Sequence, residues 1–183
     1  MDVVIGRIRT DATTMKLLIT KPTKKQELEH LKSLNKDRKF FELDNNQGHG
    51  IDWPSDIKDF EYNPSIYDCN FNRIKALRQP IKMMIERIEK EIKDYRPFDT
   101  YEIRITANGV GGEYNEEGDR GVVLIHHHAW ARSDKRLFDL TIHELIHLGI
   151  EHIVKEKKLT QDEKEKMVED IHTQLDGKKH YYL

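Results

Sequence analysis

The sequence lacks the features that place a chain outside the class of globular domains. Its 183 residues contain a single cysteine, Cys69, so no disulfide framework can form and a reducing compartment is expected. No apolar run approaches the roughly 20 residues that cross a bilayer. The N-terminus has neither the basic start nor the long apolar centre of a signal peptide. These absences predict a cytoplasmic protein without a membrane span.

An excess of one charge is also missing. The 31 Lys and Arg residues and the 33 Asp and Glu residues are mixed along the chain and leave a formal net charge of −2. Proteins that bind nucleic acid or an anionic membrane usually concentrate basic residues on one patch, and no such patch is evident. We therefore expect neither nucleic acid nor a membrane as partner. The sequence does not determine the oligomeric state.

Apolar periodicity and turn residues predict the organisation of the first half of the chain. An α/β extension over residues 1–68 begins with short strands near residues 3–5 and 16–19. Thr23 then caps a helix that runs to about Asn35, and a loop-rich connection follows. Residues 69–183 are expected to form the main domain, unless the two parts make one continuous domain. This domain opens with an amphipathic helix from about Asn70 to Tyr95, which Pro80 kinks or splits.

A β region follows, and it predicts an α+β fold with a small, mostly antiparallel sheet. Tyr101–Thr106 alternates like a half-buried strand, residues 113–115 fit a short strand, and Val122–His127 is the last strand. Turn residues separate the three, so we expect Val122–His127 to form the edge of the sheet. Ser133 and Thr160 are plausible caps for two further helices.

The strongest signal lies in the first of these helices, in the run His143-Glu144-Leu145-Ile146-His147. Two histidines four residues apart on a helix lie about 40° apart around its axis, so both imidazoles can reach one ion. Glu144 then points to the side of the pair, where it can take a proton from water rather than bind the metal. Zinc hydrolases need this division between ligands, a general base and an open coordination position.

The neighbouring residues predict that the motif helix is buried. Apolar residues cover most of its circumference and leave His143, Glu144 and His147 as a narrow polar stripe. Three ionisable groups on a buried helix are costly unless something binds them. Two other interpretations of the stripe stay open, namely core groups satisfied by hydrogen bonds and a closed, structural zinc site.

Several residues are candidates for a third protein ligand. Glu165 lies in the last helix, far enough beyond the motif for the chain to turn and return antiparallel. Glu169 and His172 share its stripe on that helix. On a continuous motif helix His152 faces away from the polar stripe, so it could bind only if the helix ended at Gly149. We favour Glu165.

Residues 98–175 resemble the zincin metallopeptidases of the gluzincin branch, and the small size of the chain is similar to that of the minigluzincins. The resemblance implies a zincin-like fold with a buried active-site helix and a following glutamate helix. It also implies a Zn²⁺ ion held by His143, His147 and Glu165, with Glu144 as general base. In gluzincins an acid four residues after the ligand glutamate, usually Asp, orients a ligand histidine, and Glu169 stands at that position.

The function implied is a zinc-dependent metallopeptidase. Because an exposed edge strand binds extended peptides by strand addition, we expect a polypeptide substrate along Val122–His127. Tyr114, His128 and His172 are candidates for stabilising the oxyanion, and the tail over residues 178–183 is a candidate for blocking the cleft. The alternatives are a catalytically silent zinc-binding regulatory or interaction module and a metal-free helical core.

Overall fold

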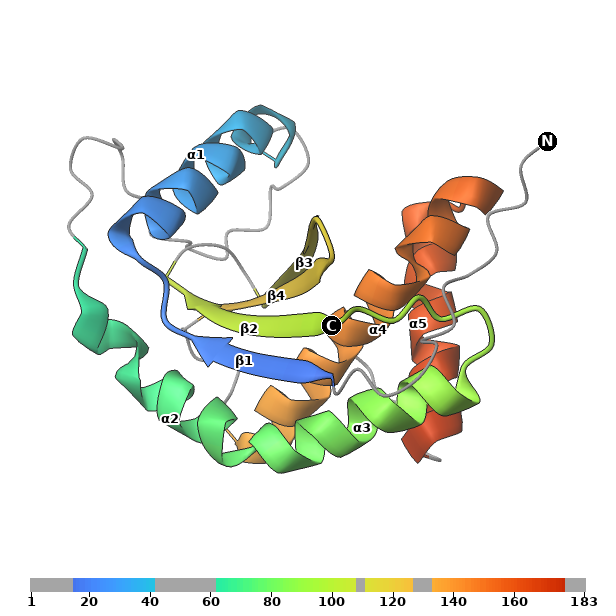
Figure 1. Ribbon diagram of the computed structural model, residues 1–183. Helices are drawn as coiled ribbons and strands as arrows, with labels where there is room; N and C mark the ends of the chain where they lie inside the picture. The colour runs from blue at the N-terminus through green and yellow to red at the C-terminus, as the bar shows by residue number, and fades with distance from the viewer. Residues whose placement is uncertain (1–14, 42–61, 108–110, 127–132, 177–183) are drawn as a thin grey trace.

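Helices pack on both faces of a four-stranded sheet (Figure 1). The computed structural model describes residues 15–41, 62–107, 111–126 and 133–176. In chain order the elements are β1 (Lys16–Thr20), α1 (Lys24–Phe41), the 3-10 turn η2 (Pro64–Tyr67), α2 (Asp68–Ala76), α3 (Arg78–Glu91), β2 (Thr100–Thr106), β3 (Gly112–Glu117), β4 (Arg120–His126), α4 (Asp134–Lys157) and α5 (Gln161–Asp176). The described residues thus form a mixed α+β fold, which confirms the predicted class.

Three helices begin at the capping residues that the sequence predicts. The hydroxyl oxygens of Thr23 and Thr160 each accept a hydrogen bond from the backbone N–H three residues ahead, in Gln26 and Glu163. The side chains of Gln26 and Glu163 in turn accept a hydrogen bond from the backbone N–H of the threonine. Each pair is a capping box, which satisfies two otherwise unpaired donors. Ser133 caps α4 through its side-chain oxygen. These starts position α1, α4 and α5.

The amphipathic segment before β2 is two helices rather than one. The chain leaves helical geometry at Leu77, where φ is −83° and ψ is 3°, so α2 ends at Ala76 and α3 starts at Arg78. Pro80 therefore lies in the first turn of α3. Proline is well tolerated there because the N–H groups of a first turn have no partner within the helix.

The sheet is mixed, and the prediction of a mostly antiparallel sheet is wrong. Its strand order is β1-β2-β4-β3, in which β1 pairs parallel with β2, and β2 parallel with β4. Only β3 runs antiparallel to its neighbour β4. The prediction assumed that consecutive strands are neighbours. The parallel pairs arise because helices separate β1 from β2, and because β3 is placed beyond β4 rather than between β2 and β4.

The prediction that Val122–His127 forms the edge of the sheet is also wrong. β4 pairs with β2 on one side and with β3 on the other, which makes it an interior strand. The composition of the strands supplies the physical reason. The apolar run Val122–Ile125 is stabilised where both faces are covered, whereas the polar residues of β3 can lie at an edge next to solvent. The edge on this side is therefore Gly112–Glu117.

β2 is buried on both faces, although its alternation predicts a half-buried strand. Tyr101, Ile103 and Ile105 point towards α3 and α4 and have no exposed surface. Glu102 and Arg104 point towards the α1 side and are also buried. The second face is covered because α1 packs over it, on the side opposite α3 (Figure 1). Glu102 accepts hydrogen bonds from Arg104 at 3.0 Å and from other side chains, which offsets the cost of burying its charge.

The N-terminal part of the described chain contributes to the same sheet as the rest. β1 lies at the far edge and pairs with β2 along its whole length. The expected strand near residues 3–5 lies outside the described residues, and the domain boundary at residue 68 stays a prediction. No helix in the described ranges is both long and apolar enough to span a bilayer.

Candidate metal centre

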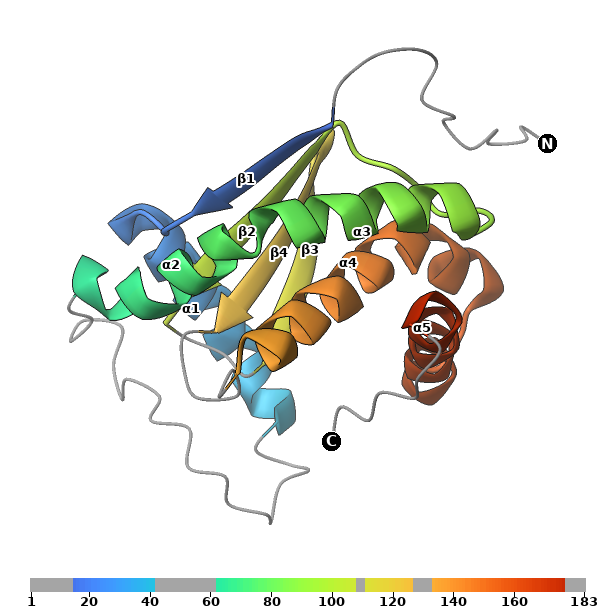
Figure 2. The same ribbon diagram turned by 90° about the horizontal axis from the view of Figure 1, so that it is seen from below.

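The helix that carries the motif is buried along its middle, as its apolar residues predict. Every residue from Thr141 to Ile150 is buried, because α3 and α5 pack beside α4 and the sheet covers it (Figure 2). Gly149 does not end the helix. A Cβ atom at this position would overlap the ring of Tyr95, whose hydroxyl donates to the carbonyl oxygen of Leu145 at 2.9 Å. Gly149 thus permits close packing, and α4 continues to Lys157.

Three side chains from α4 and α5 meet at one point. The Nε2 atoms of His143 and His147 are 3.0 Å apart. The Oε2 atom of Glu165 lies 3.4 Å from the first of these nitrogens and 3.3 Å from the second. Zinc ligands at about 2.0–2.1 Å in tetrahedral geometry lie about 3.3 Å from one another. The three donor atoms therefore form a triangle of the size that a small metal ion requires.

The path of the chain after α4 explains how Glu165 reaches the histidines. Lys158 adopts a left-handed conformation with φ 52° and ends α4, and the capping box at Thr160 then starts α5. α5 runs back beside α4 (Figure 2) and buries Val168, with two further apolar residues, in the core. Glu165 lies on the same side, and Gln161 donates to its other carboxylate oxygen at 2.6 Å.

Of the candidate third ligands, the structure brings only Glu165 to the two histidines. Within the described residues, His143, His147 and Glu165 are the one group of this kind that could hold a metal ion. His152 lies further along the unbroken helix and is outside this group, as expected for a continuous α4. Glu169 lies close enough to Glu165 to raise the pKa of that carboxyl, although burial is the larger cause. Its proposed role in orienting a histidine stays a prediction.

Burial sets the protonation of the cluster. It lowers the pKa of His143 to about 4, with smaller effects from the charges of His172 and Lys164. It lowers the pKa of His147 to about 3, again with smaller effects from nearby positive charges. Both imidazoles are consequently neutral at pH 7. Neutral imidazole is the form that binds metal ions.

Glu144 lies beside the cluster and is not one of its three members. A Cβ atom at Gly112 would overlap the Glu144 side chain, so the backbone of the edge strand β3 rests directly on this residue. Burial, followed by the charges of Glu165 and Glu113, raises the pKa of Glu144 to about 8. The carboxyl is therefore placed next to the cluster and next to an exposed strand edge. The sequence marks Gly112 only as a turn residue, and nothing in its spacing indicates this contact.

Tyr114 of β3 covers the cluster from the sheet side. Its ring stacks on that of His147 with centroids 5.3 Å apart and planes 5° from parallel. Its hydroxyl donates to Glu151 at 2.6 Å and accepts from Lys164 at 3.1 Å. Burial and the bond to Glu151 raise the pKa of Tyr114, so the phenol stays protonated. These hydrogen bonds of Tyr114 join β3 to α4 through Glu151 and to α5 through Lys164. No spacing in the sequence indicates them.

Among the described residues, His172 is a further sequence candidate, and it is not a member of the cluster. His172 is buried beside it and acts on the pKa of His143. His126, at the end of β4, has its Nε2 atom 2.7 Å from the carbonyl oxygen of Ala107. His128 and the tail over residues 178–183 lie outside the described residues.

Comparison of the chain with protein-family models, with curated proteins and with solved structures gave no match.

Proposed function

We propose that this protein is a zinc-dependent metallopeptidase with a zincin-like arrangement of the gluzincin type. The observation that carries the proposal is the triangle of two imidazole nitrogens and one carboxylate oxygen, with sides of 3.0, 3.3 and 3.4 Å. Imidazole and carboxylate donors suit Zn²⁺ in tetrahedral geometry, and three protein ligands leave a fourth position open. The His-Glu-x-x-His motif and the position of Glu165 in a following helix support the same class.

Each residue of the centre has a role that its environment supports. His143 and His147 are neutral and can donate their Nε2 lone pairs. Glu165 adds a negative charge, which favours a dication over the neutral pair of histidines alone. When bound, the metal supplies a Lewis acid for the substrate carbonyl and lowers the pKa of a water molecule.

Glu144 is the proposed general base. Its carboxylate takes a proton from water and passes it to the leaving amine. Burial, followed by the charges of Glu165 and Glu113, raises the pKa of Glu144 to about 8 against the opposing charge of Lys164. This pKa would fall with a dication at the neighbouring histidines, because the positive charge would favour the charged form of the carboxyl. The residue can then alternate between its two protonation states near neutral pH, as a proton carrier must.

A polypeptide remains the proposed substrate, and it is now assigned to β3 in place of Val122–His127. β3 is the edge strand, and it passes directly over Glu144 at Gly112 and over His147 at Tyr114. A peptide that adds to this edge by main-chain hydrogen bonds would lie alongside the cluster. Tyr114 stacks on His147 and accepts a hydrogen bond from Lys164, so these two side chains beside the cluster are candidates for stabilising the oxyanion.

Hydrolysis of a generic unfolded protein such as casein tests the proposal. Zinc-loaded protein is expected to cleave it, a chelator to stop the cleavage, and added zinc to restore it. Glu144→Gln should keep its zinc and lose turnover, because an amide cannot take a proton. If the wild type and this variant are equally inactive on all substrates while both bind one zinc per chain, the enzymatic assignment is wrong.

One observation favours a second candidate, a catalytically silent zinc-binding module. Glu144 is only 7% exposed beneath β3, which restricts the access of water and substrate to it. In that case the zinc would stabilise the fold, and β3 would serve as a docking edge without cleavage. Intact peptide bound to wild-type, zinc-loaded protein would favour this candidate.

A further inference from the structure

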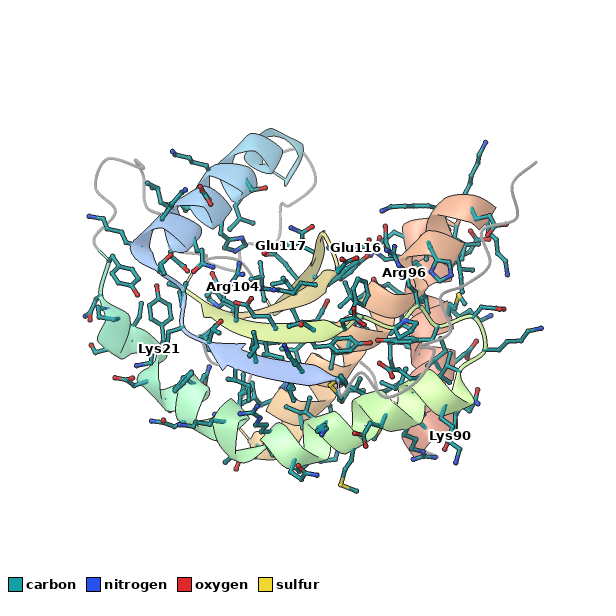
Figure 3. All side chains as sticks on the ribbon, in the orientation of Figure 1. Lys21, Lys90, Arg96, Arg104, Glu116 and Glu117 are labelled. Atoms are coloured by element: carbon teal, nitrogen blue, oxygen red, sulfur yellow. The ribbon has the colours of Figure 1, made fainter. Side chains whose placement is uncertain are left out.

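A polar cavity lies between α1 and the sheet, on the face opposite the metal centre. Its volume is about 660 Å³. The charged side chains that line it come from α1, β2 and β3, and they are Glu27, Glu29, His30, Arg104, Glu113 and Glu117. Figure 3 shows Arg104 and Glu117 on the side of the sheet that faces α1. None of these residues takes part in the proposed reaction.

The floor of the cavity is made of charges that already have partners. Glu27 is 1% exposed and accepts hydrogen bonds from the hydroxyl of Thr106 at 3.0 Å and from the backbone of Ala107 at 2.6 Å. Arg104 donates to Glu102 at 3.0 Å and to Glu117 at 3.4 Å. The floor is consequently rigid and polar, and its guanidinium is balanced by carboxylates.

The rim of the cavity is acidic and accessible. The side chains of Glu29, Glu113 and Glu117 are 61%, 39% and 42% exposed. The lining as a whole carries four carboxylates against the guanidinium of Arg104 and the imidazole of His30, whose Nε2 atom lies 3.8 Å from Glu113. A concave surface with this excess of carboxylates attracts cations. In the described ranges no three of these carboxylates lie close enough together to form a cluster of metal ligands.

Apolar residues in the same cavity indicate the shape of the cation. Val122 and Leu124 line it between the acidic side chains. Lysine and arginine carry their charge at the end of an aliphatic chain, which packs on apolar surface while the charged end meets polar groups. The lining therefore matches a basic side chain better than a compact, fully hydrated cation.

The edge strand joins this cavity to the metal centre. Successive residues of a strand point to opposite faces. Gly112 and Tyr114 face Glu144 and His147, while Glu113 between them faces the cavity. A peptide strand paired with β3 alternates in the same way. Its side chains thus reach the metal face and the cavity face in turn.

We propose that this cavity binds a lysine or arginine side chain of the polypeptide, within about two residues of the bond that lies at the metal centre. The inference rests on the proposed function for the position of the peptide along β3. It names a substrate class, peptides with a basic residue close to the cleavage point, and assigns the selection to Glu113 and Glu117.

Binding, rather than turnover, tests the inference. The zinc-loaded Glu144→Gln protein is titrated with extended peptides in which one lysine is moved along an otherwise neutral sequence, and with the matched peptide carrying glutamine. The best lysine peptide should bind about tenfold more tightly than the glutamine peptide. The difference should shrink as salt concentration rises.

A pair of variants locates the effect. Glu113→Gln in the same background should remove most of the preference for lysine, whereas Glu116→Gln should retain it. Both changes remove one charge from β3, but Glu116 lies on the opposite face, where it pairs with Arg96 at 3.0 Å. Equal affinity for lysine and glutamine peptides, no binding of either, or equal effects of the two variants would overturn the inference. The casein assay decides the proposed function separately.

Discussion

On the side of α3 and α4 the strands present aliphatic side chains, among them Ile103, Ile105 and Val123, all with no exposed surface. On the side of α1 the same strands present Glu102 and Arg104, which are 3% and 7% exposed. Aliphatic groups are stabilised by close packing alone, whereas each buried charge needs a hydrogen bond or an opposite charge. The side chains on both faces are therefore buried, but close packing stabilises one face, whereas hydrogen bonds and ion pairs stabilise the other.

This difference bears on the two candidate sites. The metal centre lies on the apolar face, where the ionisable groups of α4 are surrounded by aliphatic packing and their pKa values are shifted strongly by burial. The cavity lies on the polar face, where the buried charges have hydrogen-bond partners and the acidic rim is open to water. The apolar face favours one tightly held ion, and the polar face favours an exchangeable side chain.

The largest expected effect comes from removing a donor on the apolar face. His143→Ala or Glu165→Ala should weaken zinc binding by more than about 100-fold, because each removes one corner of the donor triangle. His152→Ala should leave zinc binding unchanged, since this residue lies outside the cluster. Zinc content after dialysis against a metal buffer measures both. If His152→Ala strips the metal and Glu165→Ala does not, the third ligand is misassigned.

Next in size is a pair of core substitutions, one on each face. Ile103→Ala should lower the free energy of unfolding by about 3–4 kcal/mol, because it leaves a cavity among rigid aliphatic neighbours. Leu124→Ala on the α1 side should cost about 1–2 kcal/mol, since Leu124 is partly exposed and lines a space that water already reaches. Urea unfolding of both variants in the presence of chelator gives the comparison. Equal losses would mean that the two faces are packed alike.

A third prediction concerns pH and Glu144 in the metal-free protein. Burial raises the pKa of Glu144 from the ordinary 4.5 to about 8 in the folded state. The stability that this group contributes is thus fully present below pH 4.5 and is lost as pH rises through about 8. Glu144→Gln cannot ionise. It should exceed the wild type by on the order of 2 kcal/mol in free energy of unfolding at pH 8, and by little at pH 5.

Chelator-treated protein, unfolded in urea at both pH values, measures this difference. Glu116→Gln serves as a control for the loss of one glutamate at a partly exposed position. A Glu144→Gln variant that is less stable than the wild type at pH 8 would show that the carboxylate is well satisfied in its buried place.

The smallest expected effect tests the ion pairs of the polar face. Burial alone would raise the pKa of Glu102, but hydrogen bonds from Arg104 and Thr20 hold it below the ordinary value of 4.5. Its contribution to stability is therefore present above pH 4.5 and is lost as pH falls through the lowered pKa. Glu102→Gln should lower the free energy of unfolding by about 1–2 kcal/mol at pH 7. It should also make that free energy depend less on pH in the acid range. Unfolding followed from pH 7 to pH 3 checks both expectations.

Local signals in the sequence predicted the helices well. Thr23, Ser133 and Thr160 cap helices because a short hydroxyl side chain satisfies a backbone donor wherever a helix starts. The apolar circumference of α4 predicted its burial, and the spacing of His143 and His147 predicted that their rings meet. Glu165 was favoured because it lies far enough beyond the motif for the chain to turn and return antiparallel. Each of these features depends on neighbours within a few turns.

The arrangement of the strands was decided by tertiary structure. The sequence contains the alternation of each strand but not its partner, so it did not reveal that β4 is interior and β3 is the edge. The contacts of Gly112 with Glu144, and of Tyr114 with His147, depend on that arrangement.

The sequence by itself determined where helices begin, which helix is buried, and that two histidines and a glutamate stand at one turn of it. Only the tertiary structure decided which strand covers that glutamate, how Lys164 reaches Tyr114, and that a polar cavity lies behind the same strand. The reason is physical. Capping and helical periodicity are set by bonds and contacts within a few residues, whereas strand order is set by the burial of faces that the chain brings together from distant positions.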